Sequence, residues 1–248
     1  MSAATERLID IVIRSYYRDL AWLALALRAL KQFVSGYRRV VVVVPRSSLD
    51  RFDSIIQRND PQVSFLSCED FTDDYLGQQI TKLHADLYTD ANVIVHLDSD
   101  QIFVAQCNLY ERLLVSGKLR MNVQRSSDRA PSDGWRHCPS IFFGEPIAWD
   151  LTAPPPLAVP RQLYGALRAY CKDRHNKSLT DYAMGFSADR FCEMALLRGF
   201  ALLYEASAFI WVDGGQSALI PECRSFWSRD TTPAKIAKAL PTCLLDTL

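Results

Sequence analysis

Two aspartates one residue apart, Asp98 and Asp100, follow an apolar run and are the side chains of this chain best suited to chemistry. The run 93–97 reads Val-Ile-Val-His-Leu, and a second apolar run follows at 102–104. In an extended chain, alternate side chains point the same way, about 7 Å apart at about 3.4 Å per residue. Carboxylates at this spacing suit one Mg²⁺ or Mn²⁺ that also binds phosphate oxygens. His96 shares that strand face, and we interpret it as a hydrogen-bonded core residue. The pattern predicts a divalent-cation site that holds part of a diphosphate.

The first hundred residues predict the elements that position this site. The predicted strands cover 8–13, 39–44, 63–66 and 92–97, and the predicted helices 20–33, 47–56 and 78–88. Five consecutive valines in 39–44 are typical of a strand buried on both faces. The alternation predicts right-handed crossovers and an α/β fold with a mostly parallel open sheet and helices on both faces. Ligands bind beyond the carboxyl ends of such strands, so we expect the polar turn 14–19 beside Asp98 and Asp100.

The second half of the chain predicts a less regular arrangement within the same single domain, 1–248. The predicted helices are 161–172 and 180–198, and the predicted strands are 121–124, 140–144, 200–204 and 208–212. Residues 125–139 predict a polar, basic loop that contains Asp133-Gly134-Trp135. Asp213-Gly214-Gly215 predicts a tight turn.

Length and composition support a folded domain with a substantial core. The chain has 248 residues, is 49% hydrophobic and carries a formal net charge of zero, so no global field favours a polyanionic partner. Residues 112–177 are nevertheless basic, with 11 Lys and Arg against 5 Asp and Glu. Either these charges are solvated helix faces, or the second half binds something anionic. Both interpretations stay open.

The cysteines and the apolar runs predict the compartment. Seven cysteines are scattered without a C-x-x-C pair, which favours reduced thiols over a disulfide frame or a zinc site. No apolar run approaches the roughly 20 residues that span a bilayer, and the opening residues lack a signal-peptide pattern. The sequence predicts a soluble, cytoplasmic protein.

Taken together, these features resemble the GT-A family of glycosyltransferases, whose nucleotide-binding βαβ half ends in an Asp-x-Asp motif. The resemblance is strongest to small bacterial members with a Gln-Gln-x-x-Lys-Leu helix before that motif, and residues 78–83 here read Gln-Gln-Ile-Thr-Lys-Leu. It covers residues 8–104 by motif and the remainder by layout. The resemblance implies a nucleotide-sugar-binding half, 1–104, and an acceptor-binding half, 105–248. It also implies a metal-dependent transfer of a sugar from a nucleoside diphosphate sugar to an acceptor hydroxyl.

The resemblance implies a set of donor-binding residues. They are Arg14, Ser15, Tyr16, Lys82, Asp98 and Ser99. Residues 14–16 would line the base and the ribose, and a tyrosine face can stack on a base. Asp100 would bind Mn²⁺ or Mg²⁺ directly, while Asp98 would contact the metal or the ribose. Lys82 would reach toward the donor phosphates or sugar, or else form a surface ion pair with Asp86.

The same resemblance implies acceptor-side roles, each with an alternative. Asp181 would be the general base of an inverting reaction, or only a carboxylate favoured by a helix N-terminus. Asp133 is a second candidate base, although Asp-Gly is first a turn signal. Trp135 would stack on a sugar or anchor the packing. Many family members add a late His or Asp to the metal. This chain has no histidine after His175, so Asp213 or water would complete the metal's ligands.

Three other interpretations use the same residues. A haloacid-dehalogenase-type phosphatase also has an Asp-x-Asp motif, but on its first strand and with the first Asp as nucleophile. A nucleotidyltransferase needs a glycine-rich loop after its first strand, and 14–19 contains no glycine. The third interpretation is a non-catalytic module that binds a nucleotide sugar. The acceptor is a glycan by default, and the basic segment keeps open an anionic acceptor such as a hydroxylated base in DNA.

Overall fold

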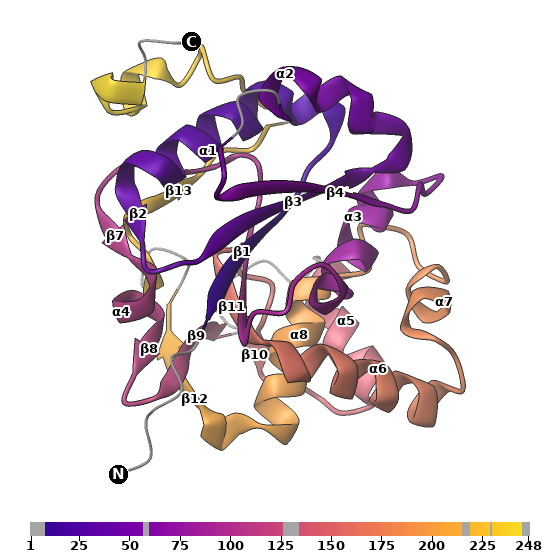
Figure 1. Ribbon diagram of the computed structural model, residues 1–248. Helices are drawn as coiled ribbons and strands as arrows, with labels where there is room; N and C mark the ends of the chain where they lie inside the picture. Colours follow the sequence, from indigo (N-terminus) through magenta and orange to yellow (C-terminus); the bar gives the residue numbers. More distant parts are fainter. Residues whose placement is uncertain (1–7, 57–59, 126–133, 215–218, 229, 245–248) are drawn as a thin grey trace.

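The central element of the molecule is a five-stranded sheet. The structure is a computed structural model that describes residues 8–56, 60–125, 134–214, 219–228 and 230–244 (Figure 1). The strand order is β11 (Leu157–Pro160), β5 (Val93–Leu97), β1 (Ile9–Arg14), β3 (Arg39–Pro45) and β4 (Val63–Cys68). β5, β1, β3 and β4 are parallel, and β11 is antiparallel to β5. The predicted α/β class with a mostly parallel sheet is confirmed.

Helices cover both faces of this sheet. They are α1 (Leu20–Phe33), α2 (Asp53–Ile56), α3 (Asp74–Lys82), α4 (Leu109–Leu113), α5 (Gly134–Phe143), α6 (Arg161–His175), α7 (Leu179–Ala183) and α8 (Glu193–Tyr204). In Figure 1, α1 runs along one side of the strands, and α3, α5, α6 and α8 gather on the other side. A 3-10 stretch, Arg46–Phe52, leads into α2. The predicted helix 78–88 instead begins four residues earlier and ends at Lys82.

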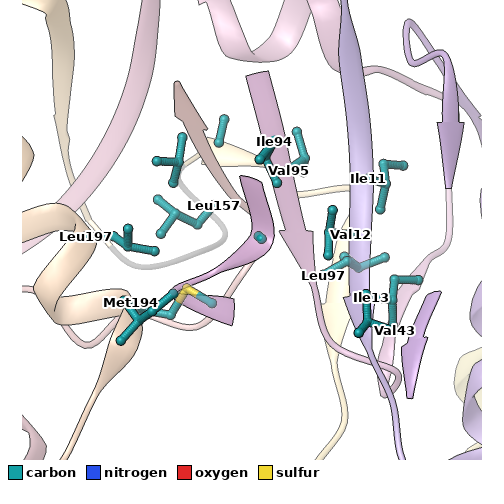
Figure 2. Close-up of a cluster of buried hydrophobic side chains, with 14 of the residues drawn as sticks. Ile11, Val12, Ile13, Val43, Ile94, Val95, Leu97, Leu157, Met194 and Leu197 are labelled. Carbon is teal, nitrogen blue, oxygen red and sulfur yellow. The ribbon is translucent and has the colours of Figure 1, made fainter. Parts of the chain in front are cut away.

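The core lies between the parallel strands and these helices. The five valines of β3 are each at most 1% exposed, as expected for a strand covered on both faces. Figure 2 shows Ile11 and Ile13 of β1 and Ile94 and Leu97 of β5 among the buried side chains. Met194 and Leu197 of α8 belong to the same buried cluster as Leu157 of β11 (Figure 2). A strand and a helix from the second half of the chain therefore complete the core of the first half.

The order of the strands reverses between β1 and β5. The chain runs from β1 outward to β3 and β4, then returns to β5 on the other side of β1. This is a topological switch point, where open α/β sheets bind their ligands. Ile13 is the register partner of Leu97, so the residues after β1 and after β5 leave the sheet side by side.

Smaller sheets extend the molecule beyond the central one. β9 (Lys118–Arg125) lies between β10 (Trp149–Asp150) and β12 (Phe209–Asp213), and also pairs with β8 (Leu114–Val115). β13 (Cys223–Ser225) pairs with β6 (Gln101–Phe103), which brings the C-terminal part back to the segment after Asp100. β2 (Val34–Ser35) pairs with β7 (Cys107–Asn108).

Four predictions for the second half were wrong, and one aromatic cluster explains two of them. The predicted strand 140–144 is the end of α5, and the predicted strand 200–204 is the end of α8. Both segments are short apolar runs, whose type is decided by packing rather than by pattern. Phe143 packs against Phe200 and Tyr204, which lie one helical turn apart, and a Cβ on Gly199 would come within 2.6 Å of the Phe143 ring. The third error is the single helix 180–198, which the structure divides into α7 and α8. The fourth is the predicted loop 125–139, because α5 already begins at Gly134.

The structure shows where the apolar segments and the cysteines lie. Within the described ranges, every helix is too short or too polar to cross a bilayer. All seven cysteines are free thiols, and six of them are buried. Most of the cysteines therefore pack as small core residues.

Candidate functional site

The Asp98–Asp100 segment forms a tight turn at the end of β5. The Gln101 N–H donates to the Asp98 carbonyl at 3.1 Å, and the Asp98 N–H donates to Gln101 Oε1 at 3.0 Å. The expectation of an extended chain through Asp98 and Asp100 is therefore wrong, because the backbone turns between them. Each carboxylate is held by different partners.

Asp98 is held by the side chains of α3. Its Oδ1 accepts from Lys82 Nζ at 2.5 Å and from Gln78 Nε2 at 3.5 Å. Lys82 Nζ also lies 3.1 Å from Glu193 Oε1, and its side chain is only 4% exposed. Burial lowers the pKa of Lys82, but the Asp98 and Glu193 carboxylates raise it above its usual value, so the ammonium stays charged. Asp98 therefore belongs to a charge triad whose other two members, Lys82 and Glu193, are buried.

The surface ion pair considered for Lys82 is not present. Asp86 is bound by both terminal nitrogens of Arg168, at 2.7 and 2.6 Å. Lys82 points inward and takes its partners from β5 and α8. Gln79, on the same helix, donates to the Ala188 and Phe191 carbonyls at 3.2 and 2.8 Å. The Gln-Gln-x-x-Lys pattern thus connects the Asp98 turn to the segment that leads into α8.

Asp100 is held by the C-terminal part of the chain. Its Oδ2 accepts from the Ser228 N–H at 2.9 Å, and its carbonyl accepts from the Phe226 N–H at 2.9 Å. Burial, the Asp98 carboxylate and Asp19 raise the pKa of Asp100 to about 6. Burial also raises the pKa of Asp19, whose carboxylate accepts a hydrogen bond from the Ser228 hydroxyl and lies within electrostatic reach of Asp98. Asp19, Asp98 and Asp100 thus form an acidic end of the site.

The donor set at this end fits a hard divalent cation with few protein ligands. Carboxylate oxygens suit Mg²⁺ and Mn²⁺, which commonly bind through one or two carboxylates plus substrate phosphates. Across the described part of the chain, no group of three or more His, Cys, Asp or Glu side chains is arranged to hold a metal. Asp213 ends β12 in the smaller sheet, and its carboxylate lies 3.6 Å from Arg125 Nε. The structure therefore does not bring Asp213 to Asp98 and Asp100 as a third ligand.

The turn after β1 meets the turn after β5 through two serines. Ser99 Oγ donates to Ser15 Oγ at 2.9 Å, so the two turns are in contact at one sheet edge, as the sequence predicted. The guanidinium of Arg14 is buried, pairs with both oxygens of Asp74 and donates to the Ser15 carbonyl at 2.8 Å. Arg14 therefore acts on the site by fixing Asp74 and Ser15.

A pocket of about 310 Å³ lies beside these turns, outside the carboxyl ends of β1, β3 and β4. Its lining residues are Tyr16, Tyr17, Pro45, Ser47, Ser48, Arg51, Asp70, Phe71, Thr72 and Asp74. The Tyr16 and Tyr17 rings lie 4.4 Å apart, and the guanidinium carbon of Arg51 lies 5.4 Å from the Tyr17 ring centroid. Asp74 lines the pocket and binds Arg14, so a continuous set of contacts runs from the pocket through Ser15 to Ser99.

Two of the acceptor-side candidates, Asp181 and Trp135, are not among the residues that line this pocket. Asp181 is exposed at the start of α7, where its Oδ2 accepts from Ser178 Oγ at 2.6 Å and its N–H donates to the same oxygen at 3.0 Å. Asp133 lies outside the described residues. Trp135 is half-buried, and its Nε1 donates to the Ala188 carbonyl at 2.8 Å. That bond and the packing of the indole against the core favour the anchoring role for Trp135.

His96 is a core residue, as the sequence analysis proposed. It is fully buried, and its Nε2 lies 2.6 Å from the Tyr164 hydroxyl. Burial, with smaller contributions from Lys82 and Arg198, lowers the pKa of His96 to about 3. A neutral imidazole in this position takes no part in the acidic end of the site.

Sequence reasoning missed four residues that shape the site: Asp19, Asp74, Glu193 and Ser228. Asp19 lies within the turn 14–19 that was expected at the site, and Asp74 also had a local signal. The preceding Asp73 accepts from the Tyr75 and Leu76 N–H groups at 3.0 and 3.2 Å, which makes it the N-cap of α3. An Asp-Asp pair before an apolar period predicts such a helix start. Glu193 and Ser228 reach the site through long-range packing.

Comparison with solved structures supports the fold. The chain is similar to 4-diphosphocytidyl-2C-methyl-D-erythritol synthase from Anaerococcus prevotii, at 12% identity and a TM-score of 0.53, over 94% of this chain and 95% of that one. It is also similar to the galactosyltransferase LgtC in complex with donor and acceptor sugar analogs, at 11% identity and a TM-score of 0.48, over 82% of this chain and 73% of that one. No family model and no curated protein matches the chain. At these identities the likeness concerns the fold alone.

Proposed function

We propose that this protein is a metal-dependent glycosyltransferase, which moves a sugar from a nucleoside diphosphate sugar to an acceptor hydroxyl. The observation that carries the proposal is the contact between the two turns at the switch point. Ser15 belongs to the turn after β1, which continues into the aromatic pocket, and Ser99 belongs to the turn that bears Asp98 and Asp100. The hydrogen bond between these two serines connects the turns. A base in the pocket would therefore have its phosphates directed toward the two carboxylates.

The residues at each end of this site have distinct roles in the proposal. Tyr16 and Tyr17 offer aromatic faces for the base, and Arg14 fixes the pocket wall through Asp74. Asp100, with Asp98 beside it, would hold Mn²⁺ or Mg²⁺. A bound divalent cation supplies Lewis-acid stabilisation of the charge that develops on the departing diphosphate. Lys82 and Glu193 keep Asp98 in place, because both are buried and contact it directly or through one another.

The first test is donor binding. A nucleoside diphosphate sugar with Mn²⁺ should raise the melting temperature, because at 100 times Kd a ligand stabilises the folded state by about 2.7 kcal/mol. The measurement is a thermal-shift panel of such sugars with Mn²⁺, with Mg²⁺ and with chelator. Asp213→Asn is the control and should keep the wild-type shift, since Asp213 lies at the end of β12 beside Arg125. A panel without any metal-dependent shift would contradict the proposal.

The second test concerns the general base. If the reaction inverts the anomeric carbon, the acceptor hydroxyl must lose its proton, and Asp181 is the described candidate. Asp181→Asn should lower transfer by about 10²–10⁴-fold while leaving donor affinity unchanged. The amide oxygen can still accept from the Ser178 hydroxyl, so the fold should be retained. Transfer rates and donor titrations on the same preparation check this, and full activity would leave Asp181 as a carboxylate favoured by a helix N-terminus.

A nucleotidyltransferase is the second candidate, because the chain shares its fold with a synthase whose named product carries a diphosphocytidyl group. The turn 14–19 counts against it, since this segment lacks the glycines that let a backbone wrap a triphosphate. Incubation with nucleoside triphosphates and sugar phosphates discriminates the two. Release of pyrophosphate would favour the nucleotidyltransferase, and release of nucleoside diphosphate from a nucleotide sugar would favour the glycosyltransferase.

A further inference from the structure

The pocket beside the turn after β1 contains a carboxylate with free acceptor capacity, that of Asp70. Ser47 Oγ donates to its Oδ1 at 2.5 Å, and the Ser47 N–H lies 3.2 and 3.3 Å from its two oxygens. A carboxylate has about four lone-pair sites, so one residue does not exhaust it. The Ser47 hydrogen bonds hold the pKa of Asp70 below its usual value, so the group is anionic at neutral pH. The other pocket carboxylate, Asp74, is occupied by Arg14.

A cationic donor lines the same pocket. Arg51 is exposed, and its guanidinium is placed over the Tyr17 ring, 5.4 Å from the centroid. A guanidinium presents a planar fork of N–H donors that matches two adjacent acceptors. The pocket therefore combines aromatic faces, a two-oxygen acceptor and a forked donor, which together can distinguish one base edge from another.

Among the common bases, only guanine can stack on the aromatic faces and also match both the Asp70 carboxylate and the Arg51 guanidinium. Its N1–H and N2 amino group are adjacent donors for the two carboxylate oxygens, and its O6 and N7 are the acceptors that arginine binds as a pair. Uracil has one N–H between two carbonyls. Adenine and cytosine place an amino group next to a ring nitrogen acceptor. With uracil, adenine or cytosine in the pocket, one oxygen of the Asp70 carboxylate would therefore face another hydrogen-bond acceptor.

We propose that this pocket selects guanine and that Asp70 is the residue that recognises it. The inference rests on the proposed nucleoside diphosphate site and narrows it to guanosine diphosphate donors. It assigns to Asp70 the N1–H and N2 amino edge and to Arg51 the opposite edge of the base. The phosphates would then extend along the contacts from Asp74 to Ser99, toward Asp100.

Titration calorimetry with Mn²⁺ and the diphosphates of guanosine, uridine, cytidine and adenosine tests the selectivity. Guanosine diphosphate should bind at least about tenfold more tightly than the other three, since a hydrogen bond to a charged group is lost with each of them. Inosine diphosphate, which lacks only the 2-amino group, should bind more weakly than guanosine diphosphate by a similar factor.

Asp70→Asn provides the sharper test. The amide would donate to a carbonyl at position 2 and accept from N1–H, so this variant should prefer xanthosine diphosphate over guanosine diphosphate. Glu69→Gln is the matched control, because Glu69 is exposed and adjacent but does not line the pocket, and it should keep the wild-type preference. Melting curves of both variants verify that they are folded.

The outcomes separate the two levels of the proposal. If no nucleoside diphosphate binds in the presence of Mn²⁺, the proposed function fails. If uridine or cytidine diphosphate binds as tightly as guanosine diphosphate, the donor site stands and guanine selectivity is overturned. If guanosine diphosphate is preferred but Asp70→Asn does not shift the preference toward xanthosine diphosphate, the assignment to Asp70 is overturned.

Discussion

Asp100→Asn should abolish sugar transfer and at the same time make the metal-free protein more stable at pH 7. Loss of a metal ligand removes Lewis-acid stabilisation worth several kcal/mol, or about a thousandfold or more in rate. The gain in stability follows from the raised pKa, because the ionised carboxylate is desolvated and faces Asp98 and Asp19. Asparagine keeps an oxygen for the Ser228 N–H and carries no charge.

The raised pKa of Asp100 determines how the stability difference between wild type and Asp100→Asn changes with pH. The pKa of Asp100 rises from 3.8 in the unfolded chain to about 6 in the folded protein. The folded state therefore binds the proton more tightly, and this contribution is complete below pH 3.8 and lost as the pH rises through about 6. A shift of this size corresponds to at most about 3 kcal/mol. Wild type and Asp100→Asn should thus differ little at pH 4 and most at pH 7.

Urea unfolding at several pH values, in chelator and in excess Mn²⁺, measures both effects. Mn²⁺ should stabilise the wild type at pH 7 and leave Asp100→Asn nearly unchanged. Asp53→Asn, an exposed carboxylate of α2, controls for the loss of one negative charge and should show neither effect. If Asp100→Asn instead unfolds the protein, the aspartate is structural and the metal site must be sought elsewhere.

Most of the sheet could be predicted from the sequence because its signals are local. Five valines in succession require burial on both faces, and a parallel sheet between helices is the structure that provides it. Alternation of strands and helices then places the polar turns after β1 and β5 at one edge. The Ser15–Ser99 hydrogen bond confirms that placement.

The secondary structure of the second half was less predictable, because it depends on side-chain contacts between residues that are far apart in the sequence. Phe142, Phe143 and Phe200 are strand formers in isolation, yet they form helices because their rings meet those of Tyr170 and Tyr204. The predicted helix 180–198 is interrupted before α8. The interruption frees the Ala188 and Phe191 carbonyls, which accept the Gln79 amide. Neither the aromatic contacts nor the break before α8 changes the hydrophobic periodicity of the sequence.

The residues of the candidate site likewise divide into those with a local sequence signal and those placed by long-range packing. The Asp-x-Asp motif and the turn 14–19 were visible because polar residues interrupt apolar runs. The direction of Asp98 was not, since it depends on Lys82 and on Glu193, 111 residues away from Lys82. A lysine and a carboxylate one helical turn apart look like an exposed pair, and only the packing of α3 against α8 turns Lys82 inward.

Lys82→Met should destabilise the protein by about 3–5 kcal/mol, which is the usual cost of removing one partner from a buried ion pair. The ammonium is 4% exposed and neutralises two carboxylates, Asp98 at 2.5 Å and Glu193 at 3.1 Å. Methionine has a similar length but no charge. Without the lysine, the buried Glu193 carboxylate would have no neutralising cation, and the partly exposed Asp98 would lose its fixed position.

Lys31→Met is the matched control for this substitution. Lys31 pairs with Asp60 at 2.9 Å, but its side chain is 73% exposed. An exposed pair of this kind contributes about 0–1 kcal/mol, so the same substitution should have a small effect there. Urea unfolding of both variants at neutral pH therefore measures what burial adds to a lysine–carboxylate pair in this fold.

A double-mutant cycle with Glu193→Gln identifies the cause of the destabilisation. In the Glu193→Gln background, Lys82→Met would strand only Asp98, whose side chain is 26% exposed and can be hydrated. The loss should then be smaller by about 0.5–3 kcal/mol, the range found for directly coupled residues. Equal losses in both backgrounds would mean that Lys82 acts through its aliphatic packing, and the triad would no longer explain the position of Asp98. A coupled loss together with weakened Mn²⁺-dependent donor binding would show that the Gln-Gln-x-x-Lys helix contributes to the site by holding this carboxylate.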